Sequence, residues 1–385
     1  MFSTRTNWNR TTNRLTEALA RHRASGRKLL DLTVSNPTES GFQYDTYAIM
    51  RALCSPASLG YQPEPHGLEP ARRAVAAYYA GRGSIVATRD IILTVSTSEA
   101  YSFVFRLLCN PGDEVLVPTP SYPLFEFLAD LQDVKLVRYP LVYDHGWQID
   151  FHSLEQAITS RTRAMIVVHP NNPTGHFTKS SEVARLNEIC ATRQLAVIAD
   201  EVFLDFSLTP STATSFAVNA EALTFTMSGL SKICGLPQMK LAWLITSGPS
   251  GQKDEALARL EVIADTYLSM NAPIQHAAHM LLAQRYEFQQ QVLTRTRTNL
   301  SVLDHQLSQQ KQCSRLEVEG GWYAVLRVPV TCSDENLAIG LLEKHGVYVH
   351  PGHFYDFPGD GYLVVSLIAP EKEFAEGIRH ILAGV

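Results

Sequence analysis

Two charged side chains draw attention because each lies beside the end of an apolar segment. Asp200 closes the run LAVIAD, and Lys232 lies in the segment SGLSKICGLPQMK, between the apolar runs ALTFTM and LAWLI. A carboxylate at the end of a buried strand needs a cationic partner or hydrogen bonds. A lysine in a turn rich in Ser, Gly and Pro is usually solvated, so position alone gives Lys232 no role.

Uncharged polar residues follow three other apolar runs in the same way. Ser96, Thr97 and Ser98 follow IILTV, Tyr122 lies between two prolines in PTPSYPLF, and Asn172 lies in NNPTG. A helix N-terminus with hydroxyl groups can bind a phosphate, although a plain Ser/Thr helix cap is the more ordinary explanation. Singly, Tyr122 also fits a core position and Asn172 a simple turn. Only the whole set points to a binding site.

The surrounding elements predict how these residues come together. Short β-rich runs alternate with helical patterns such as 96–110 and 180–194, and the main runs are 91–95, 114–118, 164–170, 195–202, 222–227 and 240–246. Strands this apolar, separated by helices, indicate a mostly parallel sheet covered by helices on both faces. In such sheets ligands bind at the carboxyl ends of the strands, which is where the polar residues lie.

The second half of the chain has a different character. Residues 251–310 read as long helices, and residues 316–385 mix short strands with helices. We therefore expect an α/β fold: a large domain with a mostly parallel central sheet flanked by helices, plus a smaller α+β domain. The expected divisions are 1–45 for an N-terminal arm and part of the small domain, 46–280 for the large domain, and 281–385 for the small C-terminal domain.

Composition narrows the function classes. The 385 residues are 45% hydrophobic, and the net charge of −5 does not favour nucleic acid or an anionic membrane as a partner. No apolar run approaches the roughly 20 residues that a membrane helix needs. The six cysteines show neither CxxC pairing nor His at metal-ligand spacing, so we expect reduced thiols, no metal site and a cytoplasmic location.

Together, the lysine, aspartate, aromatic ring, asparagine and helix N-terminus are the groups needed to hold pyridoxal phosphate. A lysine amine forms a Schiff base with the cofactor's aldehyde, and a carboxylate keeps the pyridine nitrogen protonated so that the ring draws in electrons. An aromatic side chain can stack on the ring, and an amide can hydrogen-bond its phenolic oxygen. This chemistry accounts for the whole set with one ligand.

At this point the sequence resembles the fold-type I pyridoxal-phosphate aminotransferases of class I/II. The resemblance runs from LTVSNPTESGF to YLVVSLIAP, and its most specific segments are GYQPEPHGLEPARRAVAAYY, PGDEVLVPTPSYP, HPNNPTG, VIADEVF and SGLSKICGLP. It implies that Lys232 is the Schiff-base lysine and proton carrier, with Asp200 on the ring nitrogen, Tyr122 on the ring face and Asn172 on the phenolic oxygen. Ser96, Thr97 and Ser98 match the phosphate-binding turn.

The resemblance also implies a homodimer, because Tyr61 in GYQPEPHG matches a tyrosine that reaches the phosphate in the neighbouring subunit. Three positions depart from the family pattern around the cofactor. Phe203 replaces a tyrosine that donates to the phenolic oxygen, so we expect the imine of Lys232 to keep its proton to higher pH. Lys240 replaces the usual phosphate-binding arginine and lacks its bidentate fork. Gly229 replaces a phosphate-contacting hydroxyl, which Ser228 or Ser231 is expected to supply.

A fourth departure concerns the substrate. The family usually carries an arginine two residues before the serine of its closing strand, where it clamps the substrate's α-carboxylate; this chain has Val364. Polar residues expected near the substrate are Ser35, Asn36, Arg327 and His353. His350 and Tyr355, in the same VHPGHFYDF segment as His353, are expected near the mouth of the site. A solvated or structural role is the alternative for Arg327 and each histidine.

Three functions follow from these residues. The first is an aminotransferase that moves an amino group between an amino acid or amine and a 2-oxo acid through Lys232. The second keeps the cofactor but is a lyase, decarboxylase or cyclase, because without the arginine at 364 a different bond of the substrate can be the one that breaks. The third is a non-catalytic binding protein on an enzyme fold, which the presence of both Lys232 and Asp200 disfavours.

Overall fold

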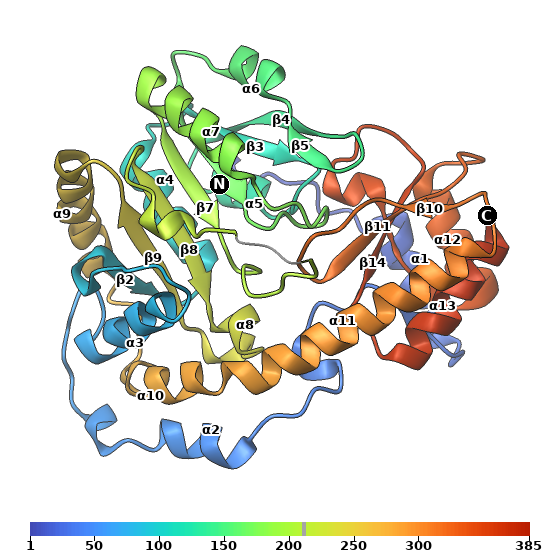
Figure 1. Ribbon diagram of the computed structural model, residues 1–385, viewed down its shortest axis with the longest axis horizontal. Coiled ribbons are helices and arrows are strands. Elements are labelled where there is room, and N and C mark those ends of the chain that lie inside the picture. Colours follow the sequence, from blue (N-terminus) through green and yellow to red (C-terminus); the bar gives the residue numbers. More distant parts are fainter. Residues whose placement is uncertain (210–212) are drawn as a thin grey trace.

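The computed structural model describes residues 1–209 and 213–385, and within these ranges a central sheet of eight strands dominates the chain (Figure 1). Across the sheet the strands follow the order β2 (Ile91–Thr94), β9 (Ala242–Ser247), β8 (Thr224–Gly229), β7 (Ala196–Asp200), β6 (Thr162–Val168), β3 (Glu114–Thr119), β4 (Lys135–Tyr143) and β5 (Trp147–Ile149). The expected α/β class is confirmed.

Most neighbours in this sheet are parallel. β8, β7, β6, β3 and β4 run in one direction, whereas β9 is antiparallel to both β8 and β2, and β5 is antiparallel to β4. The strand expected at 240–246 is therefore the reversed strand of a mostly parallel sheet. Because β2 is antiparallel to β9, it points the same way as β8. The carboxyl ends of β2, β3, β6, β7 and β8 all meet at one edge.

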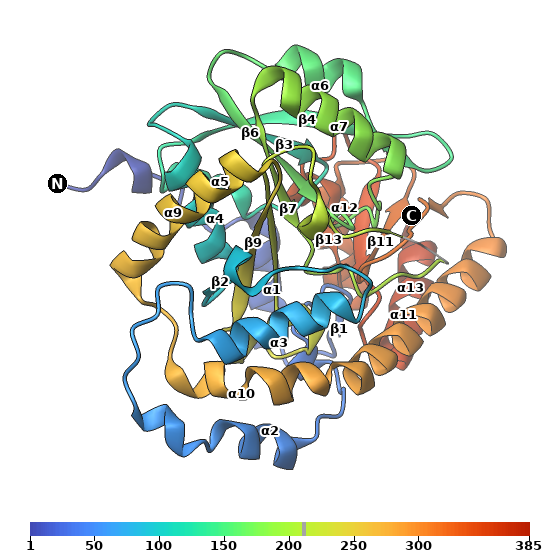
Figure 2. The same ribbon diagram turned by 60° about the vertical axis from the view of Figure 1, so that its left-hand side comes forward.

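Helices cover both faces of the sheet, as the apolar strands require. One face packs against α4 (Thr97–Leu108), α5 (Phe125–Asp130) and α9 (Ser250–Tyr267). The opposite face packs against α6 (Phe151–Ala157) and α7 (Ser180–Arg193). Near β2 and β9 the cover comes from α2 (Thr46–Leu53), α3 (Glu69–Ala80) and α10 (Ala272–Ala283). Figure 2 shows these layers from the side of α9.

A second sheet, fully antiparallel, forms in the C-terminal part. Its order is β10 (Ser314–Arg315), β11 (Tyr323–Arg327), β14 (Tyr362–Ser366) and β13 (His350–Pro351). It packs with α1 (Arg14–Ala24), α11 (Arg285–Ser308), α12 (Asp334–His345) and α13 (Glu371–Gly384) around its own apolar core. The long helix α11 runs from α10 into this part of the molecule (Figure 1).

The N-terminal segment packs with the C-terminal part. β1 (Leu30–Asp31) pairs in parallel with β12 (Val347–Tyr348), and Leu15 and Leu19 of α1 belong to the same apolar core as α12 and α13. These contacts agree with the expectation that the first residues join the small domain. The boundaries at residues 45 and 280 stay a prediction.

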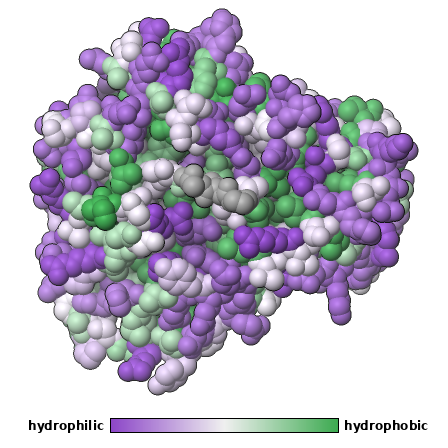
Figure 3. Space-filling view, viewed as in Figure 1, coloured by the Kyte–Doolittle hydropathy of each residue, from purple (hydrophilic) through white to green (hydrophobic). Residues whose placement is uncertain are grey.

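The remaining elements are short. They are α8 (Leu230–Ile233) and the 3₁₀ turns η1 (Thr4–Thr6), η2 (Pro37–Glu39), η3 (Pro56–Leu59), η4 (Thr88–Asp90), η5 (Phe216–Val218), η6 (Pro237–Met239) and η7 (Gly352–Tyr355). The face seen in Figure 3 is mostly hydrophilic, with apolar side chains gathered in smaller patches. Within the described ranges, every helix is too short or too polar to cross a lipid bilayer.

Candidate active site

A cavity opens at the edge where the parallel strands end, and most of the polar residues singled out in the sequence line it. From the large sheet and its loops come Ser96, Thr97, Ser98, Tyr122, Asn172, Asp200, Phe203, Ser231 and Lys232. The opposite wall comes from the N-terminal and C-terminal segments and includes Thr33, Ser35, Tyr323, His350 and Tyr355. Residues up to about 320 positions apart in sequence thus share one site, because the parallel strands end at one edge of the sheet and the N-terminal and C-terminal segments pack together across from it.

Asp200 is the last residue of β7, and its side chain is buried. The Tyr101 hydroxyl donates to its Oδ2 (3.2 Å), and the backbone N–H of Val202 donates to its Oδ1 (3.2 Å). Burial raises the pKa of Asp200 to about 6, while these donors and the charge of Lys232 act in the opposite direction. Asp200 is therefore a supported carboxylate at the base of the cavity that gains from a cationic partner.

Lys232 lies in the single turn of α8, directly after β8. Its Nζ is 5.0 Å from the centre of the Trp322 ring and 5.7 Å from that of Phe203. Burial lowers the pKa of Lys232 to about 8, and the attraction of Asp200 only partly offsets this. A lysine in these surroundings has a much larger neutral fraction near pH 7 than a solvated one, and the neutral amine is the nucleophilic form.

The N-terminus of α4 forms another part of the cavity wall. Ser96 is its N-cap, and its hydroxyl oxygen accepts from the backbone N–H of Glu99 (3.2 Å). The ordinary reading of Ser96 as a helix cap is therefore correct, and the same turn also lines the cavity with Thr97 and Ser98. Free backbone N–H groups and hydroxyls at the start of a helix of 12 residues suit a phosphate.

Asn172 and Tyr122 face the cavity from two other loops. Asn172 is buried, and its side-chain oxygen Oδ1 has no hydrogen-bond partner within the described residues. The open Oδ1 can accept a hydrogen bond from a ligand, and the NH2 of the same amide can donate one. Tyr122 is 43% exposed and packs edge-on against Phe125. Its half-open ring is available for stacking, rather than being a core position.

Two of the departures from the family pattern have structural explanations. Phe203 is buried against Trp322, with ring centres 5.2 Å apart, so an aromatic cluster surrounds this side of Lys232. At Gly229 a Cβ atom would lie 2.9 Å from Cα of Ala242 and 2.9 Å from the carbonyl oxygen of Leu241. The close approach of β8 and β9 therefore excludes a side chain, hydroxyl or otherwise, at position 229.

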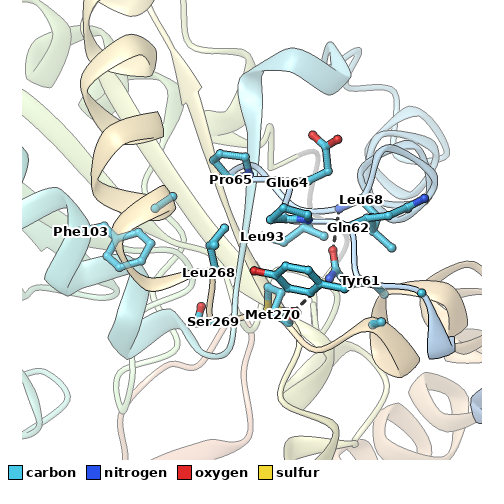
Figure 4. A pocket seen from close by; sticks show the side chains of 15 residues that line it. Tyr61, Gln62, Glu64, Pro65, Leu68, Leu93, Phe103, Leu268, Ser269 and Met270 are labelled. Atoms are coloured by element: carbon cyan, nitrogen blue, oxygen red, sulfur yellow. Dashed lines mark hydrogen bonds between the residues drawn. The ribbon is translucent and has the colours of Figure 1, made fainter.

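Two expected phosphate contacts lie outside the cavity. Lys240 adopts left-handed backbone geometry (φ 51°) after η6, and its side chain is exposed. Tyr61 is 81% exposed and lines a different pocket, which Figure 4 shows with Tyr61 beside Met270. The outward position of Tyr61 is consistent with its expected contact with a neighbouring subunit. Within residues 1–209 and 213–385, neither Lys240 nor Tyr61 lines the cavity with the other site residues.

Of the expected substrate contacts, only Ser35 lines the cavity. The side-chain oxygen of Asn36 accepts from the N–H and hydroxyl of Thr38, so it caps η2 instead. Arg327 is exposed at the end of β11, and exposed His353 lies in a surface pocket beside Arg138. The structure thus does not gather Asn36, Arg327 or His353 into the site, because each lies on the solvent side of its turn or strand.

Several residues that line the cavity or contact its lining residues escaped the sequence analysis or were only loosely placed by it. Tyr101 and Trp322 were missed: Tyr101 lies on the inner side of α4, and Trp322 contacts Lys232 from the small domain. Tyr323 precedes the noted Arg327 on the same strand. His350 and Tyr355 were expected near the mouth, and both line the cavity. The helical spacing of apolar residues after Ser96 was the one sequence signal that could have placed Tyr101 on the inner side of this helix.

The residues present fit pyridoxal phosphate. One cavity combines a buried carboxylate, a lysine with a lowered pKa, an amide whose NH2 can donate, an aromatic ring and a helix N-terminus with hydroxyls. Each of these groups matches a different part of the cofactor: the ring nitrogen, the aldehyde, the phenolic oxygen, the ring face and the phosphate. The one weak point is the cationic phosphate contact, since Lys240 lies outside.

Comparison with known proteins agrees with this site. Residues 27–381 match the family model described as aminotransferase class I and II. An alanine aminotransferase of Mycobacterium tuberculosis is 28% identical over 373 residues, which cover 94% of this chain and 86% of that protein. A glutamate–pyruvate aminotransferase of Escherichia coli is 32% identical over 260 residues, covering 67% and 64% of the two chains.

Solved structures have the same fold. The alanine aminotransferase from Pyrococcus furiosus superposes with a TM-score of 0.88 at 23% identity, covering 99% of this chain and 98% of that one. An aminotransferase from Escherichia coli gives the same TM-score at 24% identity, covering 100% and 97%. The match to the family model spans both sheets and every residue of the cavity. The chain belongs to the class I and II aminotransferases, enzymes that transfer amino groups.

Proposed function

We propose that the protein binds pyridoxal phosphate through Lys232 and transfers an amino group between a small amino compound and a 2-oxo acid. The observation that carries this proposal is that the Lys232 amine and the buried Asp200 carboxylate share one cavity, at the carboxyl ends of β8 and β7. The names of the relatives, alanine and glutamate–pyruvate aminotransferase, support the same reaction type.

When bound, pyridoxal phosphate supplies an aldehyde for amines and a protonated ring that withdraws electrons from the bond being broken. Lys232 would have two tasks: its Nζ would hold the cofactor, and the free amine would accept a proton from the substrate carbon and give one back. Because burial lowers the pKa of Lys232 to about 8, more of its amine is neutral near pH 7.5 than for a solvated lysine. The amine therefore holds and gives up a proton near neutral pH.

Asp200 would pair with the ring nitrogen and hold the proton there. It is buried and keeps two hydrogen bonds of its own, from Tyr101 and Val202. A cationic partner lowers the pKa of Asp200 below the value of about 6 that burial imposes. The side-chain NH2 of Asn172 would donate to the phenolic oxygen, and Tyr122 would cover the ring face.

The phosphate group would lie at the N-terminus of α4. Ser96, Thr97 and Ser98 line this end of the cavity, and Ser231 lies one position before Lys232 on the facing wall. Lys240 would supply the remaining positive charge if its exposed side chain turned inward. It lies two residues before Ala242, and Ala242 lines the cavity. As a single ammonium it would offer charge without the bidentate geometry of arginine.

We also propose that the enzyme is a homodimer and acts in the cytoplasm. Tyr61, Leu59, Tyr47 and Met50 are exposed to solvent in the single chain, although they are large and apolar. The pocket around Tyr61, Gln62 and Met270 in Figure 4 borders this surface. A second copy that covers it would bring Tyr61 toward the partner's phosphate. The six cysteines are free thiols, as in proteins of a reducing compartment.

The proposal is tested by the absorbance of the purified protein loaded with pyridoxal phosphate. We expect a visible absorbance band that disappears when an amino donor is added and returns with a 2-oxo acid such as pyruvate. The Lys232→Ala variant, which keeps the cavity but lacks the amine, should show neither the original band nor its cycling. Release of ammonia or carbon dioxide from the donor, without recovery of the band by a 2-oxo acid, would contradict amino-group transfer.

A further inference from the structure

The position of Val364 indicates which face of the small sheet is turned toward the cavity. β14 is flanked by β13 and β11, and Val364 is directly paired with His350 on one side and with Val325 on the other. Directly paired residues of an antiparallel sheet point to the same face. Val364 is buried and packs in the apolar cluster that contains Tyr323 and Tyr355, so this face is the one turned toward the cavity.

His350 lies on this face and is hydrogen-bonded to the neighbouring tyrosine. Its Nδ1 is 3.1 Å from the Tyr355 hydroxyl, and both residues line the cavity. Its other ring nitrogen, Nε2, makes no hydrogen bond within the described part of the chain. Tyr348 and Phe354 pack against the imidazole ring, and both His350 and Tyr355 are largely buried. The pair is held in place by its surroundings.

This pair offers the cavity one donor and one acceptor, whichever way the proton lies. If the Tyr355 hydroxyl donates to Nδ1, then Nε2–H is a donor and the phenol oxygen an acceptor. If Nδ1–H donates instead, Nε2 is an acceptor and the phenol O–H a donor. An amide or hydroxyl group can both donate and accept, so it can satisfy both of these positions. A carboxylate accepts only, so it leaves the acceptor of the pair unmatched.

The charges around the cavity favour the same kind of ligand. Among the described lining residues, Lys232 and Asp200 are the ionic ones at neutral pH, and both are assigned to the cofactor. Burial lowers the pKa of His350 to about 4, although the charge of Asp31 opposes this, so the imidazole is neutral under ordinary conditions. A carboxylate placed on this wall would lose its hydration without meeting a cation.

We propose that His350 and Tyr355 anchor the amino substrate and select compounds whose group beside the amine-bearing carbon is uncharged and both donates and accepts, such as an amide or alcohol, over compounds with a free carboxylate there. This inference rests on the proposed aminotransferase function, which it makes more specific. The carbonyl partner occupies the same cavity, so the same selection applies to it. A 2-oxo acid such as pyruvate is then the weaker-binding acceptor, and its amide the better one.

Binding of non-reactive ligands tests the inference without any turnover. Propionamide and propionate differ only in having an amide or a carboxylate, and neither carries an amine. Their affinities for the cofactor-loaded protein, measured by calorimetry, therefore report on the contacts with His350 and Tyr355 alone. We expect propionamide to bind about tenfold more tightly than propionate. His350→Phe should remove this difference, and His350→Arg should reverse it by placing a cation opposite Val364. Equal or tighter binding of propionate to the unaltered protein would overturn the proposal.

A second comparison separates this inference from the proposed function. L-Alaninamide should remove the visible absorbance band at about one tenth of the concentration at which L-alanine removes it. If L-alanine is the better donor, the anchor assignment is wrong while amino-group transfer stands. If neither compound changes the band, the proposed function fails, and the propionamide comparison still tests the anchor.

If His350→Phe does not fold, Tyr355→Phe interrupts the same pair. It should reduce the preference for propionamide over propionate at least threefold, and an unchanged preference would overturn the proposal.

Discussion

The Tyr101 hydroxyl donates a hydrogen bond to Oδ2 of Asp200 across 3.2 Å, so α4 supports the carboxylate of β7 as well as offering its own N-terminus to the cavity. Both residues are buried, and the hydrogen bond favours the ionised form of Asp200. The helix that begins with the expected phosphate turn is thus tied to the other end of the cofactor site. Shifts of α4 therefore affect both ends together.

Tyr101→Phe tests this connection. Losing a hydrogen bond to a charged group costs about 1.5 kcal/mol or more, so we expect the affinity for pyridoxal phosphate to fall about tenfold. Because the pKa of Asp200 rises without this donor, the loss should grow as pH decreases toward 6. Equilibrium dialysis at several pH values measures both effects.

Tyr139→Phe is the matched control, since the Tyr139 hydroxyl donates to the buried carbonyl of Ile166 (2.7 Å) and Tyr139 does not line the cavity. It should lower the stability of the fold without changing cofactor affinity. Equal cofactor affinity in Tyr101→Phe and the unaltered protein would mean that Asp200 does not need this support.

Phe203→Tyr should change the acid–base behaviour of the bound cofactor. Phe203 lines the cavity and packs against Trp322, so a hydroxyl at its ring end can reach a ligand without a larger rearrangement. A donor to the phenolic oxygen stabilises its negative charge and weakens its hold on the neighbouring proton. We expect the pH midpoint of the visible absorbance change to move downward by about one unit. An unchanged midpoint would show that residue 203 does not face the phenolic oxygen.

Lys240 provides a test of the phosphate contact that the single chain leaves open. If its exposed side chain turns inward to the phosphate, Lys240→Ala should weaken pyridoxal phosphate binding about tenfold, and Lys240→Arg should retain or improve it. The effect should diminish at high salt. Lys311→Ala, which removes another exposed lysine after α11, is the control. If both alanine variants bind the cofactor equally well, Lys240 stays in solvent.

Gly229→Ala should destabilise the protein, because the new methyl group would lie 2.9 Å from Cα of Ala242. Forcing β8 and β9 apart costs about 1–3 kcal/mol. The thermal unfolding midpoint should fall, and cofactor affinity should fall with it, since the adjoining α8 carries Lys232. Gly251→Ala in α9 is the counterpart, because a Cβ there meets nothing within 4 Å. Equal midpoints for the two variants would contradict the close approach.

Much of the fold was predictable from local patterns. The apolar runs at 114–118, 164–170, 195–202 and 222–227 became parallel strands, because runs buried on both faces leave little alternative, and the run at 91–95 became the edge strand β2. The polar residues at their ends then met at one edge. The reversal of β9 was not readable, since a strand's direction depends on its connections and not on its composition. The strands β4 and β5 were missed, because their sequence alternates less clearly.

The site was predictable where residues follow the parallel strands, and less so on the opposite wall. Lys232, Asp200 and Asn172 were found because each follows an apolar run. The contribution of Tyr101 depends on how α4 packs, and that of Trp322 on how the small domain meets the large one. Arg327 and Asn36 were expected to contact substrate because of their residue types, but they do not line the cavity. Arg327 is exposed at the end of its strand, and Asn36 caps a local turn.

The attachment of the cofactor to Lys232 is the central claim, and chemical trapping tests it most directly. Protein loaded with pyridoxal phosphate is reduced with borohydride, digested and sequenced by mass spectrometry. We predict that the mass of the reduced cofactor is found on Lys232, and that no other lysine carries it at comparable yield. Trapping at Lys240 or at scattered surface lysines, with Lys232 unmodified, would contradict the assignment of this cavity as the active site.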